Sequence, residues 1–284
     1  MSVANQTVAG PPAELRFHRR IGIRTSMREL WGARELIRTL AERDIRARYK
    51  QATLGIAWSV ITPIILMVVF SVFFHGVVKV KIPQGVPYPL FTYVGLLPWT
   101  FFSGCVAQGG MSLVTNNNLM NKVYCPREVF PLAACAVAAF DTTISTVILG
   151  VLFVIFTFAP KITTLWVPVI MIVQLMFTLG VTLIISSTLV YLRDLRQALP
   201  LVLQMGLFAT PVVYPSTILP ANLQWLYALL NPLAPIITSY RNVVLLGLPP
   251  QWGLLGLGAI TSSVVFFGGY IMFKRLETGF ADVA

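Results

Sequence analysis

Long runs of hydrophobic residues, separated by short polar segments, follow one another along most of the chain. A helix rises about 1.5 Å per residue, so a run of about 20 apolar residues can cross the roughly 30 Å hydrocarbon core of a bilayer. Six runs approach or exceed this length, over residues 56–78, 88–114, 129–158, 165–191, 199–214 and 254–273. The pattern predicts an all-α integral membrane protein with six transmembrane helices, in a membrane domain over residues 51–284.

The segment between the fifth and sixth runs, residues 215–250, is apolar but repeatedly interrupted by proline. Its uninterrupted pieces, such as 225–230 and 236–246, are too short to cross a bilayer. Apolar backbone that does not cross is tolerated at membrane depth only where it is buried in protein or lines a cavity. We expect two short re-entrant or interfacial helices here. The alternative is one extra broken span, which would place the C-terminus on the opposite side of the membrane.

The N-terminal part of the chain is polar. Residues 1–26 contain no long apolar run, so we expect a flexible tail and no signal peptide. Over residues 27–50, apolar positions recur at helical spacing between charged ones. These apolar positions are Leu30, Ala33, Ile37 and Leu40. A basic amphipathic helix just before a span is typical of an interface helix along the cytoplasmic headgroups; a solvated helix is the alternative.

The composition excludes several classes of protein. Of the 284 residues, 56% are hydrophobic and only 11% are charged, and the mean hydropathy is +0.78. A soluble monomer would leave much of that apolar area in water. A disordered chain or a disulfide-rich secreted domain has a different composition. The three cysteines, Cys105, Cys125 and Cys135, have no metal-binding spacing, and we interpret them as packing residues.

The net charge of +11 reports membrane topology. With both termini placed inside, the inner segments hold 17 Lys and Arg residues and the outer segments hold 4. This asymmetry follows the positive-inside rule and keeps its direction when the long N-terminal segment is left out. We therefore expect a multi-pass protein with both termini cytoplasmic. Its cations face membrane lipids, and no nucleic-acid partner is expected.

Neither a proton relay nor an ATP site is visible in the sequence. Asp141 is the only acid within the predicted spans, and no second acid or buried histidine accompanies it. An intramembrane carboxylate is a functional candidate by default, but we favour a structural acceptor of hydrogen bonds from hydroxyl groups or a cation. A proton pump and a membrane enzyme with paired carboxylates are not expected. The chain has no Gly-Lys dipeptide, hence no Walker A phosphate loop, and we expect no bound cofactor.

The loop over residues 115–130, TNNNLMNKVYCPREVF, is too elaborate for a simple turn. Asparagines cap helices or form turns, and Pro126 is suited to begin the next helix. We expect a short exposed helix that docks a partner. Its predicted surface residues are Leu119, Met120, Val123 and Tyr124.

Four segments resemble, in the same order, motifs of the permease subunits of type-2 ABC exporters. The similarity is closest to the polysaccharide exporters, which include the O-antigen, capsule and teichoic-acid systems of bacteria. The segments are RDIRARYKQATLGIAWSVITP (43–63), LPWTFFSGCVAQGGMSLVTNNNLMNKVYCPREVFPLA (97–133), YLRDLRQALPLVLQMGLFATPVVYP (191–215) and NPLAPIITSYRNVVL (231–245). The resemblance covers about residues 30–275.

The resemblance implies a half-transporter in the cytoplasmic membrane of a bacterium. In that family two copies of a six-span permease, a homodimer, form the channel, and two separate ATP-binding cassette subunits bind below it. ATP and Mg²⁺ are therefore expected on the partner subunits, and this chain is expected not to be an enzyme. The implied coupling helix is about residues 116–125, with contact residues Asn118, Leu119, Met120, Lys122, Val123 and Tyr124. The implied outward-side gate is about 215–250, with gate residues Tyr214, Trp225, Tyr240 and Arg241.

Aromatic residues deep in the second predicted span favour a sugar conduit. Trp99, Phe101 and Phe102 lie ten or more residues into that span, which is deep for an interfacial belt. Flat rings can pack on the apolar C–H faces of sugars without fixing one hydrogen-bond pattern, so a polymer could slide past them. The alternative is that these rings pack helices or face lipid.

Residues around the start of the first span are interpreted as a substrate entrance. They are Arg46, Arg48, Tyr49, Lys50 and Trp58. With Arg43, the cations would lie near the inner headgroups and attract the anionic diphosphate of a lipid-linked glycan. Positive-inside topology alone explains the same cations.

The most consistent function is export of a lipid-linked polysaccharide from the inner leaflet, driven by partner ATPases. A type-2 exporter of drugs or small lipids is the alternative, and it needs no aromatic-lined channel. An ion-coupled carrier or membrane enzyme would work without an ATPase partner and would depend on Asp141. O-antigen, teichoic acid and a cell-wall galactan stay open as the glycan.

Overall fold

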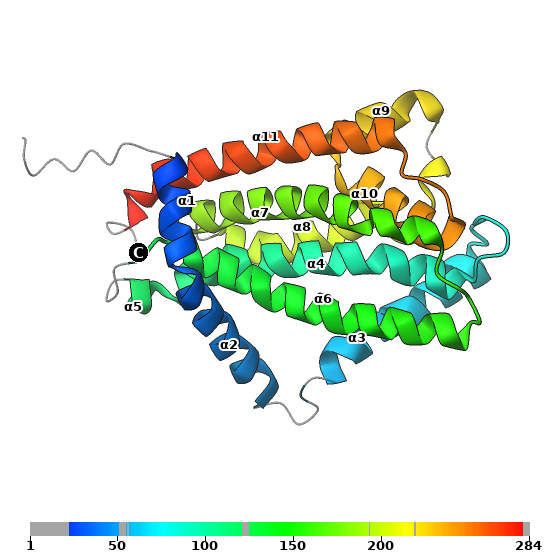
Figure 1. Ribbon diagram of the computed structural model, residues 1–284, viewed down its shortest axis with the longest axis horizontal. Coiled ribbons are helices and arrows are strands. Elements are labelled where there is room, and N and C mark those ends of the chain that lie inside the picture. Colours follow the sequence, from blue (N-terminus) through cyan, green and yellow to red (C-terminus); the bar gives the residue numbers. More distant parts are fainter. Residues whose placement is uncertain are drawn as a thin grey trace, which may run out of the picture.

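The computed structural model describes residues 23–50, 55, 57–120, 125–192, 194–218 and 220–280, with their side chains except those of residues 23–27 and 221. Over this part of the chain every regular element is a helix, which confirms the predicted all-α class. In chain order the elements are α1 (Ile23–Gly32), α2 (Arg34–Lys50), α3 (Ala57–Phe70), η2 (Ser71–Val77), α4 (Tyr88–Thr115), α5 (Asn117–Met120), α6 (Val129–Ile155), η3 (Ile162–Trp166), α7 (Val167–Tyr191), α8 (Leu195–Ala209), η4 (Ser216–Ile218), α9 (Ala221–Leu230), α10 (Leu233–Arg241), η5 (Asn242–Leu246) and α11 (Trp252–Glu277). The long helices run along the longest axis, with α1 and α5 at one end and α9 and α10 toward the other (Figure 1).

Five helices in the described part of the chain are long and apolar enough to cross a membrane. They are α3 continued by η2, then α4, α6, η3 continued by α7, and α11. Each coincides within a few residues with a span predicted from the hydrophobic pattern, which confirms those five predictions. The same pattern gave wrong boundaries elsewhere, in the fifth predicted span and at the N-terminus.

The fifth predicted span is shorter in the structure than the sequence indicates. The hydrophobic pattern places it over residues 199–214, whereas α8 begins at Leu195 and ends at Ala209. The helix ends here because Thr210 precedes Pro211, and a residue before proline is forced toward extended backbone; Thr210 has φ −99° and ψ 143°. The 15 residues of α8 reach about 22 Å at about 1.5 Å per residue, less than the hydrocarbon core.

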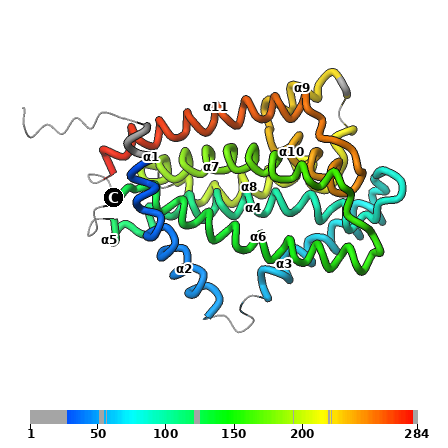
Figure 2. The backbone as a smooth tube through the Cα atoms, in the orientation of Figure 1, coloured from blue at the N-terminus to red at the C-terminus, as the bar shows by residue number. Residues whose placement is uncertain are grey.

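α4 is the central helix of the bundle. In its most apolar stretch 72% of the residues are buried within the chain, against 17% for α3 with η2. It packs on α6 and α7, and the backbone trace shows α4 and α6 running side by side (Figure 2). A helix enclosed by protein has less need of apolar side chains, which fits its lower mean hydropathy of 1.4, against 2.3 for α3 with η2.

The N-terminal segment forms two helices where the pattern over residues 27–50 predicts one. α1 already begins at Ile23, so the predicted flexible tail, residues 1–26, extends too far. α1 ends at Gly32, a residue that disfavours helix interiors. The apolar face of α2 is confirmed at Leu40, which is buried, but this face packs against α6 within the chain.

Two short helices, α9 and α10, lie in the proline-broken segment, as its pattern predicts. α10 is mostly buried and packs on α4, α7 and α11, while α9 lies along α11. Figure 1 shows both at the end of the bundle opposite α5. Burial against neighbouring helices is the condition under which non-crossing apolar backbone is tolerated at membrane depth.

Candidate functional site

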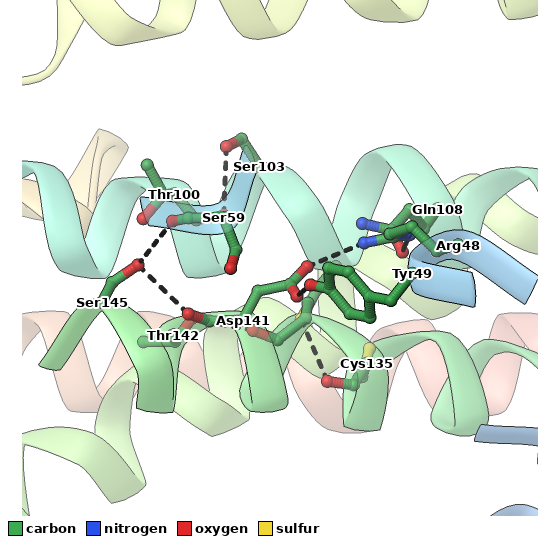
Figure 3. Close-up of polar contacts among 12 residues, drawn as sticks. Arg48, Tyr49, Ser59, Thr100, Ser103, Gln108, Cys135, Asp141, Thr142 and Ser145 are labelled. Carbon is green, nitrogen blue, oxygen red and sulfur yellow. Dashed lines mark hydrogen bonds and ion pairs between the residues drawn. The ribbon is translucent and has the colours of Figure 1, made fainter. Parts of the chain in front are cut away.

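A polar pocket of about 440 Å³ lies between α2, α3, α4 and α6. Besides the charged residues Arg48 and Asp141, its wall carries an amide, hydroxyl groups and two aromatic rings. These residues are Tyr49, Trp58, Ser59, Thr62, Thr100, Gln108, Thr142 and Ser145. The close-up in Figure 3 shows most of them projecting toward one another from the surrounding helices. A second, smaller cavity between Leu30, Leu183 and Phe266 is lined mostly by apolar side chains.

Helical spacing explains why these residues share one wall. On α4, Thr100, Gly104 and Gln108 are four residues apart and so lie on one face. On α6, Asp141 and Ser145 are separated in the same way and face α4 across the pocket. At Gly104 the two helices are in contact distance, since a Cβ atom there would lie 3.4 Å from the Ala138 Cβ atom, an ordinary van der Waals contact. The pocket is therefore a product of two polar helix faces that meet.

Asp141 is the centre of the polar network. Arg48 Nη1 donates to Asp141 Oδ2 at 2.7 Å, and the Tyr49 hydroxyl donates to Asp141 Oδ1. Arg48 Nη2 also donates to Gln108 Oε1. This geometry confirms the prediction that Asp141 accepts hydrogen bonds from a hydroxyl group and a cation. The pair stays partly accessible from the pocket, since the side chains of Arg48 and Asp141 are 39% and 26% exposed.

Tyr49 is a hydrogen-bond donor in this network at neutral pH. Burial raises the pKa of the Tyr49 phenol above its ordinary value, and the hydrogen bond to Asp141 raises the pKa further. A phenol whose pKa lies above 10 stays protonated near pH 7. The end of α2 is thus held to α6 by two donors on adjacent residues, Arg48 and Tyr49.

The structure brings together only some of the predicted entrance residues. Arg48, Tyr49 and Trp58 line the pocket, and the Trp58 side chain is 52% exposed. Arg46 and Lys50 point elsewhere and are exposed. Three of the five residues predicted as an entrance therefore share one pocket wall, and their role as an entrance stays a prediction.

Three of the four cations at the predicted entrance are paired with carboxylates. Arg48 is paired with Asp141. The other pairs are Arg43 with Asp44 at 2.8 Å and Arg46 with Glu42 at 3.5 Å. The sequence count treats each cation alone, whereas folding places a carboxylate beside three of them. Exposed pairs such as Arg46 with Glu42 contribute little to stability, but they reduce the local positive field.

The predicted conduit residues are buried inside the chain. Trp99, Phe101 and Phe102 are only 6–8% exposed. The Trp99 ring covers Gly206 of α8, and the Phe102 ring stacks on Phe177 of α7 with centroids 5.5 Å apart. These rings pack helices together, which is the alternative considered for them. Their burial within the chain favours that alternative over a conduit, a choice that depth along a helix alone could not decide.

One short helical turn lies where the coupling helix is predicted. α5 covers Asn117–Met120, with Asn118 exposed and Leu119 half-buried. Met120 was expected at the surface, but it is buried in a cluster with Leu40 of α2. Lys122, Val123 and Tyr124 lie outside the described residues.

A buried ion pair ties the base of this loop to the last helix. Glu128, just before α6, is fully buried and pairs with Lys274 of α11, which also pairs with Glu277 at 2.9 Å. Arg127 Nη1 donates to the backbone carbonyl of Glu277 at 2.8 Å. Separating a buried ion pair is costly, so the start of α6 is anchored to the end of α11. The hydrophobic pattern carried no signal for this contact.

The predicted gate residues do not form one cluster. Trp225 on α9 is exposed, and the Tyr240 hydroxyl donates to Gln174 Oε1 at 2.8 Å. Arg241 and Tyr214 do meet, since Arg241 Nη1 donates to the carbonyl of Tyr214 at 3.1 Å. Arg241 is one of the four cations that the charge count places in the outer segments. In the structure it is buried, with 3% of its surface exposed.

Comparison with known proteins places the pocket within a shared region. The sequence profile of the family described as ABC-2 type transporter matches residues 35–245. An O-antigen export system permease protein RfbA of Myxococcus xanthus is 32% identical over 258 residues, 90% of this chain and 98% of that protein. The protein of the same description from Klebsiella pneumoniae is 30% identical over 252 residues, 88% of this chain and 95% of that protein. A polysialic acid transport protein KpsM of Escherichia coli is 23% identical over 258 residues, 85% and 93% of the two chains.

Proposed function

The chain belongs to the ABC-2 type transporter family, and on this premise we propose that it is the membrane permease of an ATP-driven polysaccharide exporter. The observation that carries the proposal is the extent of the similarity to two O-antigen export permeases, which covers about nine-tenths of this chain. The more distant relative is named for the transport of polysialic acid, which is also a sugar polymer. This favours a glycan over a drug or small lipid as cargo.

The energy source in this proposal is a partner subunit. The sequence has no Walker A phosphate loop, so two separate ATP-binding cassette subunits would hold ATP and Mg²⁺. Two copies of this chain would form the channel. Exposed apolar side chains on α3 and α8, among them Val69 and Met205, are compatible with a facing copy or with lipid. Movement of the ATP-binding subunits would be transmitted through α5 to the start of α6 and the end of α11, which are held together by an ion pair.

Deletion of this chain is expected to remove the surface glycan of the cell, and affinity purification from native membranes is expected to recover an ATP-binding subunit. Complementation with the intact chain is expected to restore the glycan. A deletion strain with normal surface glycan would instead favour the drug or small-lipid exporter. Purification that recovers no ATPase, although the complex supports export, would contradict the proposed energy source.

Six crossings with both termini in the cytoplasm are part of the same proposal. α8, the fifth of the six in chain order, would make its crossing together with the irregular segment that follows it. The excess of cations on the proposed inner side supports this orientation. The orientation places the loop with Cys125 in the cytoplasm.

Cys125 is a natural reporter of that orientation. It is half-buried, whereas Cys105 and Cys135 are buried. A membrane-impermeant maleimide is therefore expected to label Cys125 in inverted vesicles and not in intact spheroplasts, with Cys125→Ser as the unlabelled control. Burial raises the pKa of the Cys125 thiol, so the thiolate fraction and the labelling rate should rise from pH 7 to pH 8.5. Equal labelling of intact spheroplasts would reverse the topology.

A further inference from the structure

The pocket between α2, α3, α4 and α6 has the chemistry of a ligand site. We propose that it binds an uncharged sugar unit of the exported glycan, with Asp141 as the main acceptor for sugar hydroxyl groups. This proposal rests on the proposed function, since it takes a glycan as the cargo. It replaces the expectation that this region attracts an anionic diphosphate.

Charge balance argues against an anionic ligand in the pocket. Among the described lining residues, Arg48 and Asp141 are the charged ones, and they neutralise each other. A diphosphate would lie beside the Asp141 carboxylate and would compete with it for the same guanidinium group. Like charges in a partly desolvated site repel strongly. A neutral ligand leaves the pair intact.

The hydrogen-bonding groups match a molecule rich in hydroxyl groups. Arg48 and Asp141 lie side by side, so the pair offers N–H donors and carboxylate acceptors at one place. A sugar hydroxyl group can likewise donate one hydrogen bond and accept another. The Thr142 hydroxyl donates to the Ala138 carbonyl at 2.8 Å, and the Thr100 hydroxyl donates to the Leu97 carbonyl at 3.0 Å. Their lone pairs are then the acceptors that they present to a ligand.

Shape and apolar surface favour a ring. The volume of about 440 Å³ lies within the roughly 300–1,000 Å³ that is usual for small-molecule sites. The half-exposed indole of Trp58 and the ring of Tyr49 supply flat apolar surfaces at the pocket wall. The C–H face of a sugar ring packs on such surfaces while its hydroxyl groups reach the polar wall. In Figure 3, Arg48 and Tyr49 project from α2 toward Asp141 of α6.

The most direct experiment captures the natural cargo with a photo-crosslinking residue. We would replace Thr62, an exposed pocket residue, by p-benzoylphenylalanine in a glycan-exporting strain, with Val147 as the control because it is exposed on α6 outside the pocket. Irradiation is expected to attach glycan, detected by periodate–hydrazide staining, at position 62 at a yield about tenfold above that at position 147. The glycan should stay attached after mild acid, which cleaves a sugar–diphosphate bond. Glycan that mild acid releases would show contact with the lipid anchor and would overturn the proposal.

Two pairs of substitutions separate a sugar site from an anion site. Asp141→Asn is expected to lower the crosslinking yield about tenfold, since one charge-assisted hydrogen bond is lost; an anion site would give a higher yield. Thr142→Ala should also lower the yield and Thr143→Ala should not, although both threonines make the same bond within α6. Protein levels in the membrane are compared by immunoblot. Unchanged yield in both pocket variants would overturn the proposal, whereas glycan export that continues after deletion of this chain would contradict the proposed function instead.

Discussion

Gly269→Ala is expected to destabilise the bundle by about 3 kcal/mol, while Gly268→Ala should leave its stability unchanged or slightly raised. A Cβ atom at Gly269 would lie 2.6 Å from the carbonyl oxygen of Gly180, so the backbones of α7 and α11 would have to separate. In a bilayer, close packing of small residues is a main source of helix association. A Cβ atom at Gly268 meets nothing within 4 Å, and alanine favours the helix by about 0.5–1 kcal/mol over glycine.

The two glycines are neighbours in one helix, so each variant controls for the other. The measurement is the midpoint of thermal unfolding of the purified protein in a fixed detergent. Gly180→Ala should reproduce the loss from the partner helix, because its Cβ atom would lie 2.7 Å from the Phe266 backbone. Equal midpoints for Gly268→Ala and Gly269→Ala would contradict the packing of α7 on α11.

Spans could be predicted where a single physical requirement decides them. A helix that crosses lipid must be apolar over about 20 consecutive residues, so the local sequence alone shows whether this requirement is met. The end of α8 was missed because the apolar run continues through Pro211, while the backbone leaves the helix one residue earlier. The turn at Gly32, between α1 and α2, was missed because the hydrophobic period continues across it.

The sequence predicts the type of interaction that Asp141 makes, but not which residues make it. A lone carboxylate within a span needs donors, so a hydrogen-bonded Asp141 followed from its type and position. Its donor Arg48 lies 93 residues away, and only the packing of α2 on α6 brings them together. The same gap applies to the predicted conduit residues. Trp99 is deep in α4, but its burial depends on α8, whose place the sequence does not state.

Arg241→Met is expected to destabilise the protein by about 3–5 kcal/mol, the largest effect that we predict for a polar side chain. The guanidinium group donates to the carbonyls of Pro211 at 2.7 Å and Phe91 at 3.1 Å, and also to those of Val212 and Tyr214. Three of these carbonyls follow the end of α8, where no helical N–H group reaches them. Buried carbonyls without a donor cost about 1–3 kcal/mol each.

Arg241→Lys should recover only part of the loss, because an ammonium group lacks the planar fork that reaches several acceptors. It also loses much of the contact with the Phe91 ring, whose centroid lies 3.7 Å from the guanidinium carbon. Arg275→Met is the matched control, since Arg275 is exposed on α11. The measurement is the unfolding midpoint together with the amount of monodisperse protein in detergent. A lysine variant as stable as the parent would mean that charge alone suffices at this position.

Gly95 on α4 tests the same contact between Arg241 and the carbonyl groups that follow α8. A Cβ atom at Gly95 would collide with Arg241 Nη2 and would lie 2.5 Å from the Val212 carbonyl oxygen. Gly95→Ala should therefore displace the guanidinium group and destabilise the protein, and adding Arg241→Met should cost less than the sum of the two single changes, because the two variants remove one shared contact. Additive losses would show that the glycine and the arginine act separately, and that Arg241 does not hold the end of α8 against α4.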